Sequence, residues 1–194
     1  DKAIENYQRS LKLARQIKAK QRELEALGSL GLAYEDLKDY SQAITYLQNS
    51  IKIAKEIGDP KAQSMGLNNL GHVLFTAGKL EEAEKTLRDA VKLLDEMRPG
   101  LSDTYKIYIF DTQYHTYNLL QQILVAANKP KAALEAAEQG RARAFVDLLA
   151  TRTAKNQDVK SINSQLSFNI NTNLSIKQIR EDRKSTRLNS SHSS

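Results

Sequence analysis

The sequence of 194 residues contains no cysteine. This absence excludes a disulfide scaffold, a zinc site with thiolate ligands and a cysteine nucleophile within these residues. No apolar run approaches the roughly 18 residues that a membrane-spanning helix needs, so we expect no membrane partner. The chain opens with Asp1 and shows no basic-then-apolar leader, so targeting signals are either absent or outside this sequence, and we expect a cytoplasmic protein.

The common catalytic motifs are also missing. There is no glycine-rich phosphate loop, no Gly-x-Ser-x-Gly elbow and no His-Glu-x-x-His zinc motif. Histidine occurs only at His72, His115 and His192, and His72 and His115 lie in different repeats of a chain without cysteine. We therefore expect no enzymatic activity, no cofactor and no metal ion.

Basic residues outnumber acidic ones by 29 to 23, which gives a net charge of +6. Residues 1–150 hold 21 basic and 20 acidic side chains, whereas residues 151–194 hold 8 and 3. A nucleic-acid-binding domain would carry its basic residues on the folded body. Because this body is nearly neutral, we expect no nucleic-acid partner.

A period of 40 residues runs through the first half of the chain. The matching positions are Ala3, Ala43 and Ala83, then Ile4 and Ile44, then Leu30-Gly31 and Leu70-Gly71. The next copy, at Ala133, comes 50 residues after Ala83, so ten extra residues lie between Pro99 and Lys131. A fixed period of this length indicates stacked helical repeats.

Each repeat reads as two amphipathic helices, because apolar residues recur at every third or fourth position. Breaks fall at Gly58-Asp59-Pro60, where Asp59 is a predicted N-cap, and at Gly78, Pro99-Gly100 and Asn128-Lys129-Pro130. We predict helices at residues 2–18, 21–37, 41–57, 61–77, 81–97, 103–127 and 131–151, and no strand. Such pairs must stack to bury their apolar faces, which predicts an all-α fold, an α-α superhelix whose first helices line a concave surface.

Small residues recur where paired helices should approach closely. Gly31 and Gly71 each precede by 12 positions the alanines Ala43 and Ala83. Small side chains at these places allow close helix packing. We therefore predict that a bulky residue at Gly31 would overpack the contact.

These residues resemble the tetratricopeptide repeat, whose pattern has Leu-Gly, an aromatic residue, Ala, a large apolar residue and a second Ala. The matching residues are Leu30-Gly31, Tyr34, Ala43, Leu47 and Ser50, then Leu70-Gly71, Leu74, Ala83, Leu87 and Ala90. Two positions differ from the pattern: Leu74 stands in place of the aromatic residue, and Ser50 stands in place of the last alanine. The resemblance covers residues 1–150, with an incomplete first repeat, and implies a superhelix that binds proteins.

A later segment is similar to the repeat array that precedes the caspase-like CHAT domain in cyanobacterial proteins. Its residues are Arg98-Pro99-Gly100-Leu101-Ser102-Asp103, Phe110-Asp111-Thr112-Gln113 and the stretch from Asn128-Lys129-Pro130 to Gly140-Arg141-Ala142-Arg143-Ala144-Phe145. The resemblance implies a sensor or docking arm whose partner is the CHAT protease domain of a longer parent chain. That domain's His and Cys pair is missing here, so no catalytic residue carries over. Arg141 and Arg143 are candidate docking residues for it, with a solvated face as the alternative.

The C-terminal segment has a different composition. Residues 151–180 are expected to form an unfolded Ser/Asn-rich linker, since nine of the 16 residues 161–176 are Ser, Thr or Asn. Residues 181–194 resemble a translated sequencing adaptor, so we expect a disordered, artefactual tail. A genuine disordered tail is the alternative.

Concave-face residues follow from the position of the Leu-Gly step. Side chains three before, one after and four after its glycine should face the groove. The predicted groove residues are Gly28, Leu32, Glu35, Asn68, His72, Phe75, Asn118, Gln122 and Val125, with His115 one turn earlier. Their amides and the apolar Phe75 suit an extended or helical peptide, while a merely solvated surface is the alternative for each residue.

We therefore interpret the chain as a protein- or peptide-binding module, the regulatory or sensor arm of a longer CHAT-type protein. Two alternatives stay open. One is a stand-alone scaffold that self-associates through exposed apolar ends. The other is a non-catalytic fragment of a caspase-like cysteine protease.

Overall fold

The computed structural model describes the backbone of residues 2–97 and 103–153, and the side chains of residues 2–97 and 112–142. The linker is predicted for residues 151–180, and its part from residue 154 on lies outside the described residues, as does the predicted tail, residues 181–194. The described chain is entirely helical, without a strand. Its helices are α1 (Lys2–Gln16), α2 (Lys20–Asp36), α3 (Tyr40–Glu56), α4 (Pro60–Thr76), α5 (Leu80–Met97), α6 (Asp103–Ala126) and α7 (Pro130–Thr153). The predicted helices are confirmed, and each boundary agrees to within two residues.

The helix ends carry the signals that the sequence predicts. The Asp59 carboxylate caps α4 by accepting a hydrogen bond from the Ala62 N–H at 2.9 Å, and Asp39 caps α3 in the same way. One residue in each described turn has positive φ, namely Lys18, Lys38, Gly58, Gly78 and Asn128. This left-handed residue ends each helix and reverses the chain.

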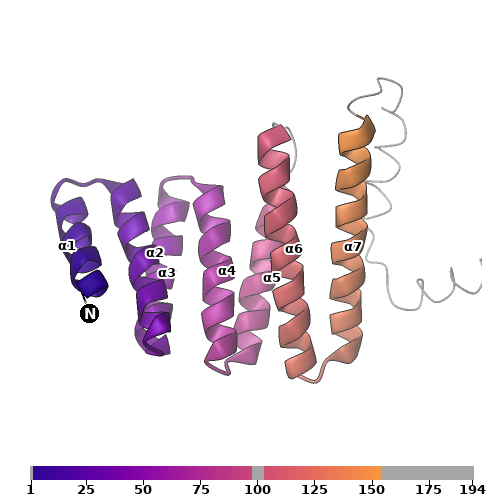
Figure 1. Cartoon of the computed structure of the whole chain (residues 1–194), viewed down its shortest axis with the longest axis horizontal. Helices are drawn as coiled ribbons and strands as arrows, with labels where there is room; N and C mark the ends of the chain where they lie inside the picture. Colours follow the sequence, from indigo (N-terminus) through magenta and orange to yellow (C-terminus); the bar gives the residue numbers. More distant parts are fainter. Residues whose placement is uncertain (1, 98–102, 154–194) are drawn as a thin grey trace, which may run out of the picture.

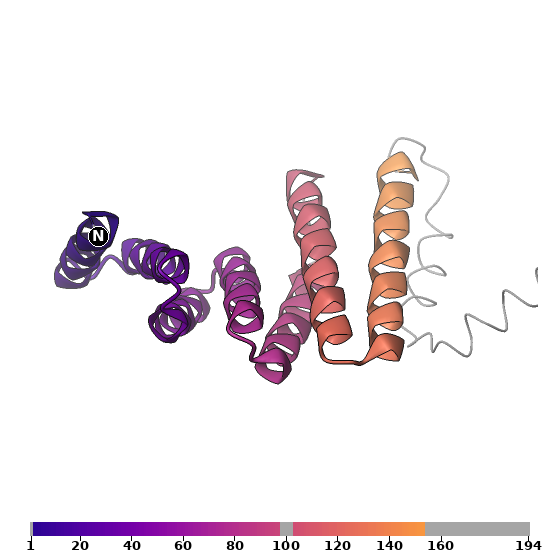
Figure 2. The same ribbon diagram turned by 60° about the horizontal axis from the view of Figure 1, so that its bottom comes forward.

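The helices stack in chain order as antiparallel hairpins, α2 with α3, α4 with α5 and α6 with α7, while α1 packs on α2 (Figure 1). Contacts also join α2 to α4 and α4 to α6, whereas no contact joins α3 to α5 within the described residues. The first helix of each hairpin therefore lies on the inner side of the stack. Figure 2 shows the helices turning progressively along it, as the predicted superhelix requires.

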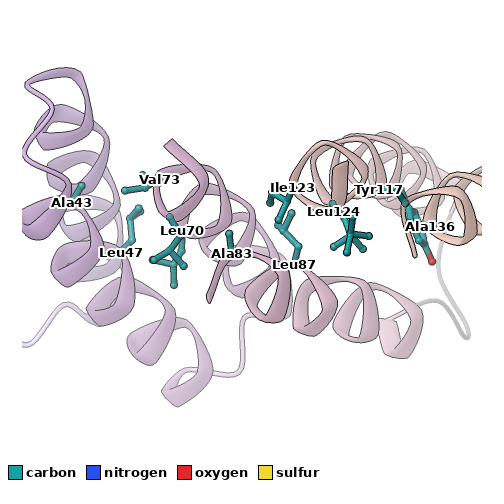
Figure 3. Packing of buried hydrophobic residues seen from close by; sticks show 13 residues of the cluster. Ala43, Leu47, Leu70, Val73, Ala83, Leu87, Tyr117, Ile123, Leu124 and Ala136 are labelled. Carbon is teal, nitrogen blue, oxygen red and sulfur yellow. The ribbon is translucent and has the colours of Figure 1, made fainter. Parts of the chain in front are cut away.

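A continuous apolar core runs between the hairpins (Figure 3). Leu47, Leu87 and Leu124 are fully buried in it, together with Ala43 and Ala83. A second cluster around Leu27 and Leu30 extends the core to α1. Burial of this kind supplies most of the driving force for stacking repeats.

Close helix contacts occur at the predicted glycines. A methyl group on Gly31 would lie 2.6 Å from Leu47 Cγ, and one on Gly71 would lie 2.5 Å from Leu87 Cδ2. Both distances are far inside van der Waals contact, so a larger residue cannot fit without movement. The prediction of close packing at Gly31 is confirmed.

Ser50 occupies a buried position that holds alanine in the next repeat, Ala90. Its hydroxyl donates a hydrogen bond to the Leu24 carbonyl oxygen at 3.2 Å. The polar group is therefore satisfied inside the core.

The last hairpin is longer than the others. Helices α6 and α7 have 24 residues each, against 17 in α2, and they extend beyond the ends of the other helices (Figure 1). Part of the ten-residue insertion in the repeat period therefore lengthens the hairpin of α6 and α7.

Candidate functional site

The predicted groove residues lie on α2, α4 and α6, the inner helices of the stack. Their side chains are exposed or partly buried; none belongs to the fully buried core. Leu32 is 43% exposed and Val125 is 61% exposed, so the inner face includes large apolar side chains open to solvent.

One pocket, termed here the N-terminal pocket, lies between α2 and α4 and has a volume of about 450 Å³. Its floor includes Leu24 and Leu47, and its rim includes the half-exposed Leu32 and Met65. The remaining lining residues are Gln21, Glu25, Gly28, Ser29, Ser50, Asp59, Lys61, Ala62, Gly66 and Asn69. The pocket is thus an apolar depression with polar groups at its edge, the usual form of a binding site.

A second pocket, termed the C-terminal pocket, lies between α4 and α6 and has a volume of about 540 Å³. Its lining residues are Phe75, Asn118, Gln121, Gln122, Val125 and Ala126. The structure therefore brings together four predicted groove residues, Phe75 from α4 and three from α6. This pocket combines apolar surface with three carboxamides and has no charged lining residue.

Polar contacts between neighbouring repeats lie near these pockets. His72 Nδ1 on α4 lies 2.6 Å from Glu35 Oε1 on α2. The Asn68 side chain donates to the Ser64 carbonyl oxygen at 3.1 Å and accepts from the Thr116 hydroxyl at 2.8 Å. Glu35, Asn68 and His72 therefore connect the inner helices and line neither pocket.

The other predicted site residues lie apart from the pockets. His115 is exposed on α6, where its ring meets Tyr114 edge-on at 5.7 Å. Arg141 is exposed on α7 and pairs with Glu138, and the side chain of Arg143 lies outside the described residues. No group of three or more potential metal ligands occurs within the described residues.

Met65, Asn69 and Gln121 are pocket residues that the sequence prediction omitted. Met65 lies six residues before Gly71, the glycine of its Leu-Gly step, and His115 is predicted at the equivalent position of the longer repeat. Counting six residues back from the glycine in every repeat would have identified Met65 and Glu25 from the sequence. Asn69 and Gln121 follow only from the tilt of neighbouring helices.

Two carboxylates with altered titration lie outside both pockets. A hydrogen bond from Lys129 to Glu84 at 2.7 Å lowers the pKa of the Glu84 carboxyl, and Arg88 reinforces the effect. A hydrogen bond from Arg15 at 2.9 Å likewise lowers the pKa of Glu23. Each pair joins different helices or turns, which indicates a structural role for these charges.

None of the described helices is long and apolar enough to cross a membrane.

Comparison with known proteins identifies the repeats. Residues 1–56 and 22–96 match the family model of the tetratricopeptide repeat. Tetratricopeptide repeat protein 28 of Mus musculus and that of Homo sapiens are each 42% identical to this chain over 93 residues, which cover 47% of this chain and 4% of the relative. Response regulator aspartate phosphatase A of Bacillus subtilis (strain 168) is 26% identical over 145 residues, 70% of this chain and 35% of the phosphatase. The chain thus matches only a small part of the length of these relatives.

Proposed function

Because residues 1–96 consist of tetratricopeptide repeats, we propose that the chain is a protein-interaction module whose inner helices bind a peptide segment of a partner protein. The observation that carries this proposal is the pair of apolar pockets on α2, α4 and α6. Both contain exposed large apolar side chains, Met65 at 50% and Val125 at 61%. Exposed large apolar side chains that line a pocket are typical of interaction sites.

The proposed role is binding without catalysis. Repeats of this type present extended concave surfaces for partners. The carboxylates whose pKa is lowered lie outside both pockets and are held by cationic side chains. The pockets offer apolar and amide contacts, with Glu25, Asp59 and Lys61 at the edge of the N-terminal pocket, and such contacts suit recognition of a peptide.

A more specific part of the proposal concerns a longer parent protein. We propose that the array is the regulatory or sensor arm of a CHAT-type protein and that Arg141 and Arg143 dock the protease domain. The support is the resemblance of the segments around these residues to such arrays. Charge reversal of both arginines should weaken association of this chain with a purified CHAT domain supplied separately, whereas unchanged association would refute the docking role.

Selection of peptides on the full chain tests the binding function. A library of random 16-residue peptides displayed on phage is selected on the immobilised protein. Each enriched peptide is then measured against the double variant Met65→Lys, Val125→Lys and against Leu134→Lys. Leu134 is a matched control because it is a large apolar residue, 45% exposed, on the outer helix α7 and in neither pocket.

The proposal predicts peptides whose binding is lost in the double variant and kept in Leu134→Lys. A selection that enriches no peptide sensitive to the double variant would contradict it. Circular dichroism of the variants checks that they fold, as expected for substitutions at exposed positions.

Self-association is a second candidate function, favoured by the exposed face of α1. Tyr7 is 37% exposed, whereas Leu47 and Leu87, its equivalents at the 40-residue period, are fully buried against a neighbouring helix. We propose that this face contacts a second copy of the chain. Light scattering at increasing concentration should show dimers that Tyr7→Lys removes and the control Leu37→Lys, at a residue 55% exposed in a turn, retains. A monomer at every concentration would contradict this candidate.

A further inference from the structure

The two pockets lie at different heights along α4. The N-terminal pocket contacts the first half of this helix around Met65, whereas the C-terminal pocket contacts only Phe75 near its end. Phe75 follows Met65 by ten positions in the helix, which corresponds to a rise of about 15 Å. A ligand that occupies both pockets must therefore run obliquely across α4.

The pockets also lie on opposite flanks of α4, one facing α2 and the other facing α6. Packed helices have axes about 8–10 Å apart. When the lining residues of α2 and α6 are included, the pocket centres are shifted by about 12–15 Å along α4. Together with the sideways distance of about 8–10 Å, this shift places the pocket centres about 15–18 Å apart. An extended chain covers that distance in about five residues, and a helix covers it in about 10–12.

The amide groups of the pockets discriminate between these two conformations. Asn69 in the N-terminal pocket, and Asn118, Gln121 and Gln122 in the C-terminal pocket, form no side-chain hydrogen bond to another of the described residues. An extended peptide offers main-chain N–H and C=O groups that pair with such amides. A helix has already paired these groups internally, so it would leave the amides unused.

The surface between the pockets is polar. His72, whose side chain is 57% exposed, stands between Met65 and Phe75 in the sequence of α4 and is held by Glu35 at 2.6 Å. A large apolar side chain above this hydrogen-bonded pair would cover the imidazole and the carboxylate without replacing their hydration, which is unfavourable. The residues of the ligand that cross α4 should therefore be small or polar.

We infer that the ligand of this groove is an extended peptide with two apolar anchor side chains four to six residues apart, one in each pocket, joined by small or polar residues. This inference rests on the proposed function and specifies its ligand. The C-terminal pocket, lined only by uncharged residues, takes a neutral apolar anchor. The N-terminal pocket takes the second anchor between Leu32 and Met65.

The peptides selected on the full chain provide the test. Their sequences should share two apolar positions four to six residues apart. In synthetic copies, alanine at either anchor should weaken binding to the unmodified protein at least about tenfold, the effect of losing one buried apolar side chain. Inserting six glycines between the anchors should also weaken it, because a longer flexible linker lowers the effective concentration of the second anchor.

Pocket variants then assign each anchor to its site. In Met65→Lys, alanine at one anchor should no longer change the affinity, while alanine at the other should keep its full effect. In Val125→Lys the pattern should be reversed, so that alanine at the other anchor no longer changes the affinity. In the control Leu134→Lys, alanine at either anchor should weaken binding as it does in the unmodified protein. Fluorescence anisotropy of the labelled peptides measures each affinity.

The outcomes separate this inference from the proposed function. Groove-binding peptides with a single anchor, with anchors 10–12 residues apart, or with both anchors sensitive to the same variant would overturn the inference and leave the function standing. A selection without any peptide sensitive to Met65→Lys or Val125→Lys would overturn both.

Discussion

Replacing Gly31 with alanine should destabilise the protein, whereas the same replacement at Gly28, one turn earlier on α2, should stabilise it. A methyl group on Gly31 would lie 2.6 Å from Leu47 Cγ and 2.8 Å from Leu47 Cδ2. A methyl group on Gly28 would meet only Ser50 Oγ at 3.6 Å, an ordinary contact. The two sites therefore receive the same chemical change in opposite steric environments.

The magnitudes follow from two opposing terms. Alanine in place of glycine inside a helix stabilises by about 1 kcal/mol, and this term applies equally to both positions. Overpacking a core contact costs about 1–3 kcal/mol, and this term applies only to Gly31. Gly28→Ala should therefore gain up to about 1 kcal/mol and Gly31→Ala should lose up to about 2 kcal/mol, so the difference of about 1–3 kcal/mol measures the overpacking alone.

Urea denaturation followed by circular dichroism at the helix band measures both variants. Leu47→Ala in the Gly31→Ala background provides the matching control, since removing the obstructing side chain relieves the clash. Its cost there should be smaller than the roughly 2–5 kcal/mol expected for a buried leucine in the unmodified protein. Equal stability of Gly28→Ala and Gly31→Ala would refute the close-packing argument.

Three further predictions concern a turn, an ion pair and the groove. Lys38→Gly should stabilise the protein by about 1 kcal/mol because Lys38 has a φ of +61°, whereas Lys52→Gly inside α3 should destabilise it by a similar amount in the same urea assay. The cationic partners of Glu84 lower the pKa of its carboxyl group. The stability that these interactions add to the folded protein is therefore present above the ordinary pKa of 4.5 and is lost as pH falls through the lowered pKa. The stability difference between the unmodified protein and Glu84→Gln, about 1 kcal/mol at pH 7, should therefore shrink below pH 4.5, and a constant difference would contradict this sign. His72→Ala combined with Asn68→Ala should weaken peptide binding in a titration and leave the helix signal unchanged, because these side chains link α4 to α2 and α6 and so position the two pockets; full affinity would refute this positioning role.

The helical architecture was predictable because its causes are local. The spacing of Gly31 before Ala43 predicts which helices pair, and the contact between Gly31 and Leu47 confirms it. Asp59 before Pro60 predicts a helix start, and its capping hydrogen bond confirms that as well. Such signals need only the neighbouring residues in the chain.

The pockets were only partly predictable because they depend on how neighbouring helices tilt. Counting from the Leu-Gly step identified Phe75 and Gln122 but omitted Met65, which holds the same place in its repeat as His115. The engagement of Asn68 with Thr116 joins residues 48 apart in the sequence, and no local pattern encodes such a contact.

Binding at the inner face can be tested most directly through the two methionines of the chain, Met65 and Met97. Met65 lies in the N-terminal pocket, and Met97 is the last residue of α5, outside both pockets. Protein labelled with ¹³C at the methionine methyl groups is titrated with a selected peptide and followed by NMR. We expect the Met65 signal to shift to saturation while the Met97 signal stays in place. A peptide that binds without moving the Met65 signal would contradict the assignment of this groove as the binding site.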